Sequence, residues 1–339
     1  MSTQHPPRLP TAGQLLNLAL AYLGAGLSRL VRRPVVLGAP AMLMVEPTTA
    51  CQLRCPHCAL GRGELTRPAA RLTLEEFRRI WDAVRPAPAL LQLWNQGEPL
   101  LNPEIAAIIR HAASSGARVV LSTNVEPLEK ELLAAELVDA GLHELILSLD
   151  GATAESHLAY RTGGSFEKVE RGVRNIVAVR RERGVRHPKL TWQFILFRHN
   201  LPEADEAKRL ARRWGVDRVV FKTAQLEDTA REEGERWLPE EPRLRRYDLR
   251  GDRWVLRRGA HFFCDRIYTS ATVLADGRVV PCCFDKDGSH VLGNALEQPF
   301  PEVWRGRAYQ AFRRRMLTAD RPGMCGNCTE GLRNLEVKP

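Results

Sequence analysis

Two hydrophobic patterns alternate along residues 41–223 of the chain. Short apolar runs, typical of buried strands, stand at 41–47, 90–96, 117–124, 143–151, 189–197 and 216–223. Amphipathic helical patterns lie between them at 73–84, 102–116, 129–141, 165–184 and 203–215. Apolar strands that alternate with helices predict an α/β fold, a parallel sheet covered by helices. The pattern leaves open sheet and barrel as alternatives, and both collect ligands at the carboxyl ends of their strands.

Those strand ends carry polar residues and cysteines. They are Cys51, Cys55 and Cys58 after the first strand, Gly97-Glu98-Pro99 after the second, Ser122-Thr123-Asn124 at the third and Asp150-Gly151 at the fourth. Because parallel strands end at one edge of the sheet, we expect these residues to share a site.

The segment before the first strand, residues 1–40, holds one helical pattern. Leucines at 16, 20, 23, 27 and 30 recur at helical spacing, and Arg29, Arg32 and Arg33 follow the apolar part. We expect a helix packed on the body of the protein, or a helix on a membrane surface with these arginines at the headgroups. The apolar stretch is expected to be too short to span a bilayer, and charges that follow it do not suit a signal peptide.

Two further regions complete the predicted organisation after the α/β region, which ends near residue 224. Residues 225–259 are rich in Glu, Arg and Pro and are expected to form a charged linker or lid. Residues 260–339 are rich in cysteines and turns and predict a small, metal-stapled domain. The net charge of +10 fits an arginine-rich surface. No basic run is interleaved with aromatic residues, so nucleic acid is not an expected partner.

The eight cysteines form two groups with close spacings, which favours metal binding in a reducing, cytoplasmic compartment. "CQLRCPHC", residues 51–58, supplies three thiolates on one loop. A four-iron cluster normally takes four, so three leave one iron open to another ligand. A zinc ion that borrows a distant cysteine is an alternative, and His57 is a second candidate ligand.

This stretch resembles the signature of the radical S-adenosylmethionine (SAM) superfamily. "NQGEP", "STN" and the segment 148–176 resemble further motifs of that family, so that the resemblance spans residues 41–223. His57 departs from the family, where an aromatic residue is common, and Gln96 replaces a motif glycine.

The resemblance implies a partial (β/α)6 TIM-like barrel and reductive cleavage of SAM to a 5'-deoxyadenosyl radical. The cluster would be held by Cys51, Cys55 and Cys58, and SAM would be bound by Gln96, Gly97, Glu98, Pro99, Ser122, Asn124, Ser148 and Arg161. A flavodoxin- or ferredoxin-type protein would supply the electron.

The second cysteine group resembles the SPASM/twitch extension of this family. We expect one auxiliary 4Fe-4S cluster on Cys264, Cys282, Cys325 and Cys328, either redox-active or structural. Cys283 is left over as a buried residue or as an alternative to Cys282. A zinc ribbon is the structural alternative for this group.

Relatives with this architecture modify peptides or proteins, which is the expected function, or act on small molecules. The alternative substrate is a sugar, an aminocyclitol or a lipid-linked molecule, since residues 1–40 are too few for a leader-binding winged helix. Acid–base candidates are Gln193, Glu227 and Asp228 near the strand ends. An iron–sulfur electron carrier and an RNA-modifying enzyme are the other function classes considered.

Overall fold

The computed structural model of the protein describes residues 10–257, 263–329, 332 and 336–339. Six strands lie side by side in chain order: β1 (Met42–Val45), β2 (Leu90–Leu93), β3 (Arg118–Thr123), β4 (Glu144–Ser148), β5 (Lys189–Leu196) and β6 (Arg218–Thr223). Each neighbouring pair is parallel. The predicted partial (β/α)6 barrel is therefore confirmed.

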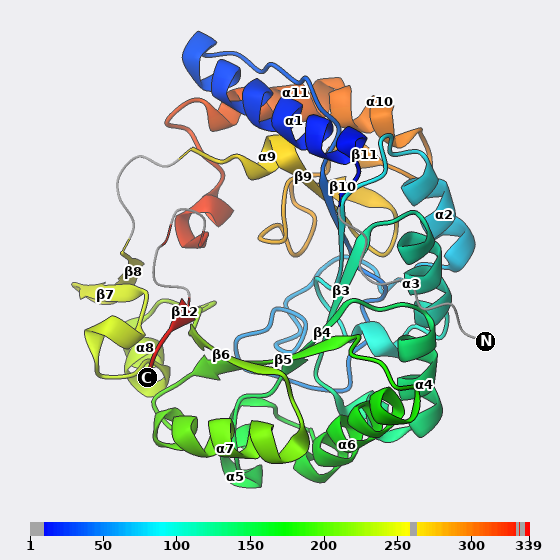
Figure 1. The fold of residues 1–339 in the computed structure, drawn as a ribbon. Helices are drawn as coiled ribbons and strands as arrows, with labels where there is room; N and C mark the ends of the chain where they lie inside the picture. The colour runs from blue at the N-terminus through cyan, green and yellow to red at the C-terminus, as the bar shows by residue number, and fades with distance from the viewer. Residues whose placement is uncertain (1–9, 258–262, 330–331, 333–335) are drawn as a thin grey trace.

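Helices cover the outer face of this curved sheet (Figure 1). They are α2 (Leu74–Asp82), α3 (Ile105–Ser114), α4 (Glu131–Asp139), α6 (Phe166–Glu182) and α7 (Ala204–Trp214). Short helices α5 (Ala154–Tyr160), η1 (Pro99–Leu101), η2 (Glu126–Glu129) and η3 (Leu201–Glu203) lie in the connections. Alternate strand residues such as Trp192 and Phe194 pack outward in the buried core, which leaves Gln193 and Ile195 on the inner face.

The C-terminal region continues the same sheet. Its elements are α9 (Arg266–Thr269), β9 (Ser270–Val273), β10 (Arg278–Val280), β11 (Gly293–Asn294), α10 (Phe300–Arg305), α11 (Arg307–Met316), η5 (Gly323–Asn327) and β12 (Glu336–Val337). β9 pairs in parallel with β1, and β12 pairs antiparallel with β6. The region therefore extends both edges of the barrel sheet and does not form a sheet of its own.

The charged segment after β6 is folded, which corrects the expectation of a linker over 225–259 for its described part. It contains α8 (Arg231–Trp237), η4 (Pro242–Leu244) and the antiparallel pair β7 (Tyr247–Arg250) and β8 (Arg253–Leu256). The physical reason is its buried apolar set, which includes Trp237, Leu244 and Tyr247. Trp237 and Tyr247 pack in a second core with Leu53 and Cys55 of the cysteine loop, whereas Leu244 belongs to the main core.

The N-terminal helix α1 (Ala12–Val31) lies against α9 and the residues before β1. At 20 residues it is long and apolar enough to cross a membrane by length and composition, which corrects the expectation that it is too short. Asn17 lies on the buried side of this helix, and its side chain exchanges two hydrogen bonds with the backbone of Ala39. One third of the helix is buried on the protein.

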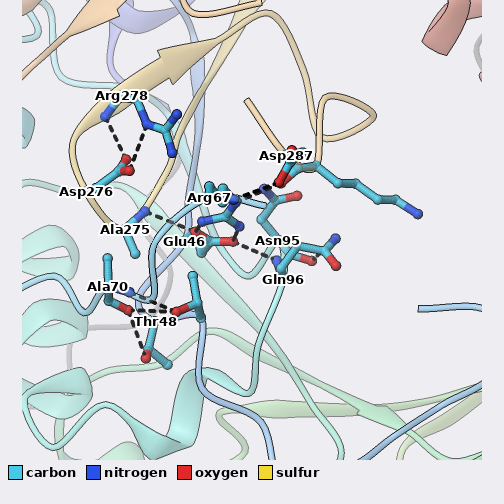
Figure 2. Close-up of polar contacts among 12 residues, drawn as sticks. Glu46, Thr48, Arg67, Ala70, Asn95, Gln96, Ala275, Asp276, Arg278 and Asp287 are labelled. Carbon is cyan, nitrogen blue, oxygen red and sulfur yellow. Dashed lines mark hydrogen bonds and ion pairs between the residues drawn. The ribbon is translucent and has the colours of Figure 1, made fainter. Parts of the chain in front are cut away.

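A buried ion pair joins four segments at the carboxyl ends of three neighbouring strands. Glu46 follows β1, is fully buried and receives two hydrogen bonds from Arg67, at 2.8 and 2.5 Å (Figure 2). The backbone N–H groups of Gln96 after β2 and Ala275 after β9 donate to the same carboxylate, at 3.0 and 3.1 Å. Burial raises the pKa of Glu46, and the Arg67 guanidinium opposes that rise.

Arg67 also reaches the loop that follows Cys282 and Cys283. Its Nε donates to the Lys286 carbonyl at 2.9 Å, and the Asp287 carboxylate accepts from the backbone N–H groups of Thr66 and Arg67. The bidentate geometry satisfies both partners inside the protein, which is the condition for a buried pair to be tolerated. This Glu46–Arg67 bridge fastens the C-terminal region to the barrel.

Arg67→Met is expected to lower the free energy of unfolding by about 3–5 kcal/mol, because it leaves the Glu46 carboxylate buried without its cation. Denaturant unfolding followed by tryptophan fluorescence measures the loss. Arg174→Met, which removes the exposed pair with Glu170, is the control and should cost at most about 1 kcal/mol.

The double variant Glu46→Gln/Arg67→Met removes the orphaned charge and keeps one acceptor oxygen, for the N–H of either Gln96 or Ala275. It should be more stable than Arg67→Met alone. Equal losses for Arg67→Met and Arg174→Met would show that the buried bridge contributes no more than a surface pair.

Candidate active site and auxiliary metal site

The cysteine loop begins directly beyond Glu46 and folds as a series of tight turns. The N–H of Cys58 donates to the Cys55 carbonyl, and the N–H of Leu53 donates to the Cys51 sulfur at 3.4 Å. Gly61 lies so close to Cys55 that a Cβ there would stand 2.7 Å from its backbone. The loop thereby turns all three sulfurs toward the strand ends.

One cavity of about 190 Å³ brings the sequence motifs together. Its lining includes Cys51, Cys55, Cys58, Gln96, Gly97, Glu98, Ser122, Asn124, Ser148 and Arg161. Of the residues expected to bind SAM, Pro99 alone is outside this lining; it is buried at the start of η1. The structure therefore places the residues of four strand ends around one space.

The turn after β2 approaches the cysteine loop backbone to backbone. Gly97 has φ of +79°, and a Cβ on it would stand 2.2 Å from the Thr48 carbonyl oxygen. The next N–H, of Glu98, donates to the Ala50 carbonyl at 2.7 Å. Only glycine fits this approach, which sets the Gln96 side chain beside Cys58, with 3.7 Å between oxygen and sulfur.

The Glu98 carboxylate is used within the protein. It accepts hydrogen bonds from the Thr123 hydroxyl, the Asn124 N–H and the Leu100 N–H, at 2.7, 2.7 and 3.1 Å. Burial raises its pKa to about 7, against the lowering effect of these bonds. Glu98 therefore joins the end of β2 to the end of β3.

Arg161 joins the fourth strand end to the cysteine loop. Its guanidinium pairs with buried Asp150 at 2.6 Å, and Nη1 lies 4.0 Å from the Cys55 sulfur. Asp150 in turn accepts from the N–H of Ile195, which anchors the pair to β5. Nε and Nη2 of the guanidinium thus bond to Asp150, and Nη1 contacts the Cys55 sulfur.

Ser122 and Ser148 stand on the inner faces of β3 and β4, with their hydroxyl oxygens 3.0 Å apart. Asn124 accepts from Gln52 of the cysteine loop and from the Glu126 N–H, and its amide nitrogen is 4.0 Å from the Cys51 sulfur. These side chains present hydroxyl and amide groups to the cavity beside the three sulfurs.

The donor set suits a multi-iron cluster better than a single ion. In the part of the chain that the structure describes, no three His, Cys, Asp or Glu side chains converge closely enough to hold one metal ion. A four-iron cluster takes one thiolate on each iron, so its ligands need not converge on one atom. Burial raises the pKa of Cys51 to about 12, so that a thiolate there calls for a bound cation.

A second cavity, of about 20 Å³, gathers the other predicted ligands. Cys264, Cys282, Cys325 and Cys328 all line it, with Phe312, Met316 and Met324 around them. Cys283 is not in its lining, and its sulfur lies 3.6 Å from the Arg266 guanidinium. Four sulfurs around an apolar space fit a fully ligated cluster.

The three acid–base candidates are not in the lining of the cavity of the first three cysteines. Glu227 contacts Lys286, on the loop that follows Cys282. Asp228 accepts from the N–H of Ala230, as a turn residue does. Gln193 is half-buried on the inner face of β5. Of these three residues, Glu227 is the one that contacts the loop following Cys282.

The sequence did not predict a cluster of aromatic rings that packs behind the cysteine loop. The His57 ring is buried against Tyr160, Phe197 and Trp237, with ring centroids 5.2–6.5 Å apart. Burial lowers the pKa of His57 to about 4. His57 packs as an aromatic residue and is not in the cavity lining. Trp237, one of two tryptophans in 225–257, was the available signal in the sequence.

Two family models match the chain. The radical SAM superfamily matches residues 45–211, and the SPASM iron–sulfur cluster-binding domain matches residues 264–329. Together they contain all seven cysteines that line the two cavities.

Three curated relatives support the same assignment. The AdoMet-dependent heme synthase of Methanosarcina barkeri is 27% identical over 329 residues, 86% of this chain and 88% of that protein. The mycofactocin maturase MftC of Mycobacterium ulcerans is 31% identical over 53% of this chain and 46% of its own length. The PqqA peptide cyclase of Streptomyces rochei is 27% identical over 82% of this chain and 79% of its own.

The fold is shared with a solved structure. SuiB of Streptococcus suis bound to S-adenosylmethionine superimposes with a TM-score of 0.60 and 14% identity, over 82% of this chain and 68% of that one. The barrel, the two cysteine cavities and the two family models lead to one conclusion: the chain belongs to the radical SAM superfamily and carries a C-terminal SPASM domain, with 4Fe-4S clusters and S-adenosylmethionine as its cofactors.

Proposed function

We propose that this radical SAM enzyme modifies a peptide or protein substrate. The similarity to a PqqA peptide cyclase carries the proposal, because it covers 82% of the chain, more than the barrel region alone. The relation to a mycofactocin maturase and the fold shared with SuiB, which is also solved with a precursor peptide, support it. When bound, the cluster and SAM supply hydrogen-atom abstraction from the substrate.

The roles of the cavity residues follow from their positions. Cys51, Cys55 and Cys58 are proposed to hold the cluster, with Arg161 beside Cys55 to stabilise its thiolate. Gln96, Ser122, Ser148 and Asn124 line the cavity and are proposed to contact SAM, together with the backbone of Gly97. Glu98 and Pro99 act by shaping the strand end.

Glu227 is the acid–base candidate that we retain. It lies after β6 and is held by Lys286 of the SPASM loop. We propose that this carboxylate, held by the loop that follows Cys282, accepts a proton from the substrate. Asp228 and Gln193 are proposed only as neighbouring polar groups, since Asp228 is committed to its own turn.

The electron donor is proposed to be a small acidic protein of the flavodoxin or ferredoxin type. The net charge of +10 favours association with an acidic partner. We propose a cytoplasmic location, because buried thiols that bind clusters require a reducing compartment.

A small-molecule substrate is the second candidate. The heme synthase similarity covers 88% of that relative, the largest share among the curated relatives described above. It favours a substrate of the porphyrin class over the sugars and aminocyclitols.

The test uses protein reconstituted anaerobically with iron and sulfide, then supplied with dithionite and SAM. Peptides encoded beside the gene are expected to increase 5'-deoxyadenosine formation and to change in mass. Deuterated peptide should pass its label to 5'-deoxyadenosine. Stimulation by iron porphyrins, with none by peptides, would replace the peptide proposal with the second candidate.

The auxiliary ligand set is tested by metal content. Cys282→Ser is expected to lower bound iron from about eight atoms to about four, because it removes one of four thiolates. Cys283→Ser, the adjacent control, should leave iron near eight, since Cys283 is outside the lining of that cavity. Loss of iron in Cys283→Ser alone would exchange the two assignments, and stoichiometric zinc would make the site a zinc ribbon.

A further inference from the structure

Helix α1 places small and polar residues against the protein and most of its large apolar side chains toward solvent. Its buried residues are Gln14, Asn17, Ala21, Gly24, Ala25 and Ser28. Its exposed large apolar residues are Leu15, Leu16, Tyr22, Leu23, Leu30 and Val31, between 44% and 78% exposed. This arrangement is the reverse of an ordinary surface helix, whose apolar stripe faces the core.

The exposed residues form one patch. Seven of the twelve exposed large apolar residues in the described chain lie between Leu15 and Leu37. At 100° per residue, Leu16, Leu23 and Leu30 fall within a narrow stripe, and the patch runs about 24 Å along the helix from Leu15 to Val31. Contiguous apolar patches of this kind mark interaction surfaces.

The orientation of α1 is fixed by specific bonds on its buried side. Gln14 donates to the carbonyl of Ala87, and Asn17 exchanges two hydrogen bonds with Ala39, at 3.0 and 2.9 Å. Ser28 accepts from the N–H of Val35 at 2.7 Å. Gly24 and Gly38 allow close backbone contact, since a Cβ on either would stand under 3 Å from a carbonyl oxygen.

Rolling the helix to bury its leucines, or inserting it across a bilayer, would break these bonds and strand Gln14, Asn17 and Ser28 in an apolar setting. Each buried polar group without a partner costs of the order of 1–3 kcal/mol. The outward leucines are therefore a stable feature of the fold.

The charges near the patch indicate whether it binds a membrane or a second copy of the chain. Arg29, Arg32 and Arg33 are exposed at one end of the patch, and residues 10–45 contain no Asp or Glu. In a symmetric dimer through this face, the three arginines would find no acidic partner on the facing helix. Anionic lipid headgroups complement them, with aliphatic chains for the leucines and an interface for Tyr22.

We propose that the exposed face of α1 binds the surface of an anionic lipid bilayer and holds the enzyme there. Gln14 and Asn17 tie this helix to residues that precede β2 and β1, whereas the cysteine cavity lies beyond the carboxyl ends of the same strands. The bilayer therefore meets the side of the barrel away from the cavity. The mouth stays open to substrates from water, so this contact is a tether and not a route for lipid chains.

The test is co-sedimentation of cluster-loaded, full-length enzyme with vesicles of phosphatidylcholine, alone or mixed with phosphatidylglycerol. Binding is expected on the mixed vesicles and should weaken as salt rises from about 0.1 M to about 1 M. Arg29→Gln/Arg33→Gln should weaken it roughly tenfold. No binding to the mixed vesicles would overturn the proposal.

Leu16→Ser/Leu30→Ser tests the apolar face and should weaken vesicle binding roughly tenfold or more. The control is Leu132→Ser/Val255→Ser, which removes exposed apolar residues from α4 and β8 and should bind as the parent does. Both double variants should keep their iron content and circular dichroism, since all four side chains are exposed. Equal weakening by both would show nonspecific adhesion and overturn the assignment to α1.

Sedimentation velocity tests whether a second copy of the chain binds the patch instead. The enzyme is expected to be monomeric through this face, with identical profiles for the parent and Leu16→Ser/Leu30→Ser. A dimer that the variant dissolves would assign the patch to a second copy instead. Vesicle-bound protein that resists both high salt and alkaline carbonate would indicate an inserted helix and would likewise overturn surface binding.

Discussion

The Glu46 carboxylate is the point on which the arrangement of this enzyme depends. It collects a guanidinium from the loop after the cysteines and backbone N–H groups from the turns after β2 and β9. A buried carboxylate is costly unless every lone pair is used, so these four segments are held in one relative position. Gln96 and the cysteine loop, which line the cavity of the first three cysteines, and the loop beyond Cys282 are consequently fixed by the same group.

The sequence predicted the six strands and the cysteine sites because each is encoded locally, by period or by spacing. The Glu46–Arg67 pair was not predicted, since a charge at the end of an apolar strand does not name its partner 21 residues away. The same limit applies to Glu98 and Arg161. Their motifs predict contact with SAM, and both residues line the cavity. The motifs do not identify the partners within the protein, which are Thr123 and Asn124 for Glu98 and Asp150 for Arg161.

The helix before the barrel shows a different limit of hydrophobic patterning. The leucine period correctly predicts a helix at Ala12–Val31, but it does not say which face meets the protein. Here small and amide side chains form the contact between α1 and the rest of the protein. Gly24 and Gly38 allow the backbones to approach, and Asn17 bonds to Ala39. Direction of burial was therefore decided by hydrogen bonding and close packing, which a hydropathy pattern does not contain.

The single sheet has a consequence for how the chain acquires its fold during synthesis. β1, the edge strand at one side of the barrel, pairs with β9, which is synthesised more than 200 residues later. β6, at the other edge, pairs with β12, residues 336–337. Until then both edges offer unpaired N–H and carbonyl groups, the surfaces through which nascent chains associate wrongly. Pairings this distant in sequence also slow folding. The last eighty residues thus complete the barrel as well as the auxiliary site, and a nascent chain that stops short of them leaves both edges of the sheet open.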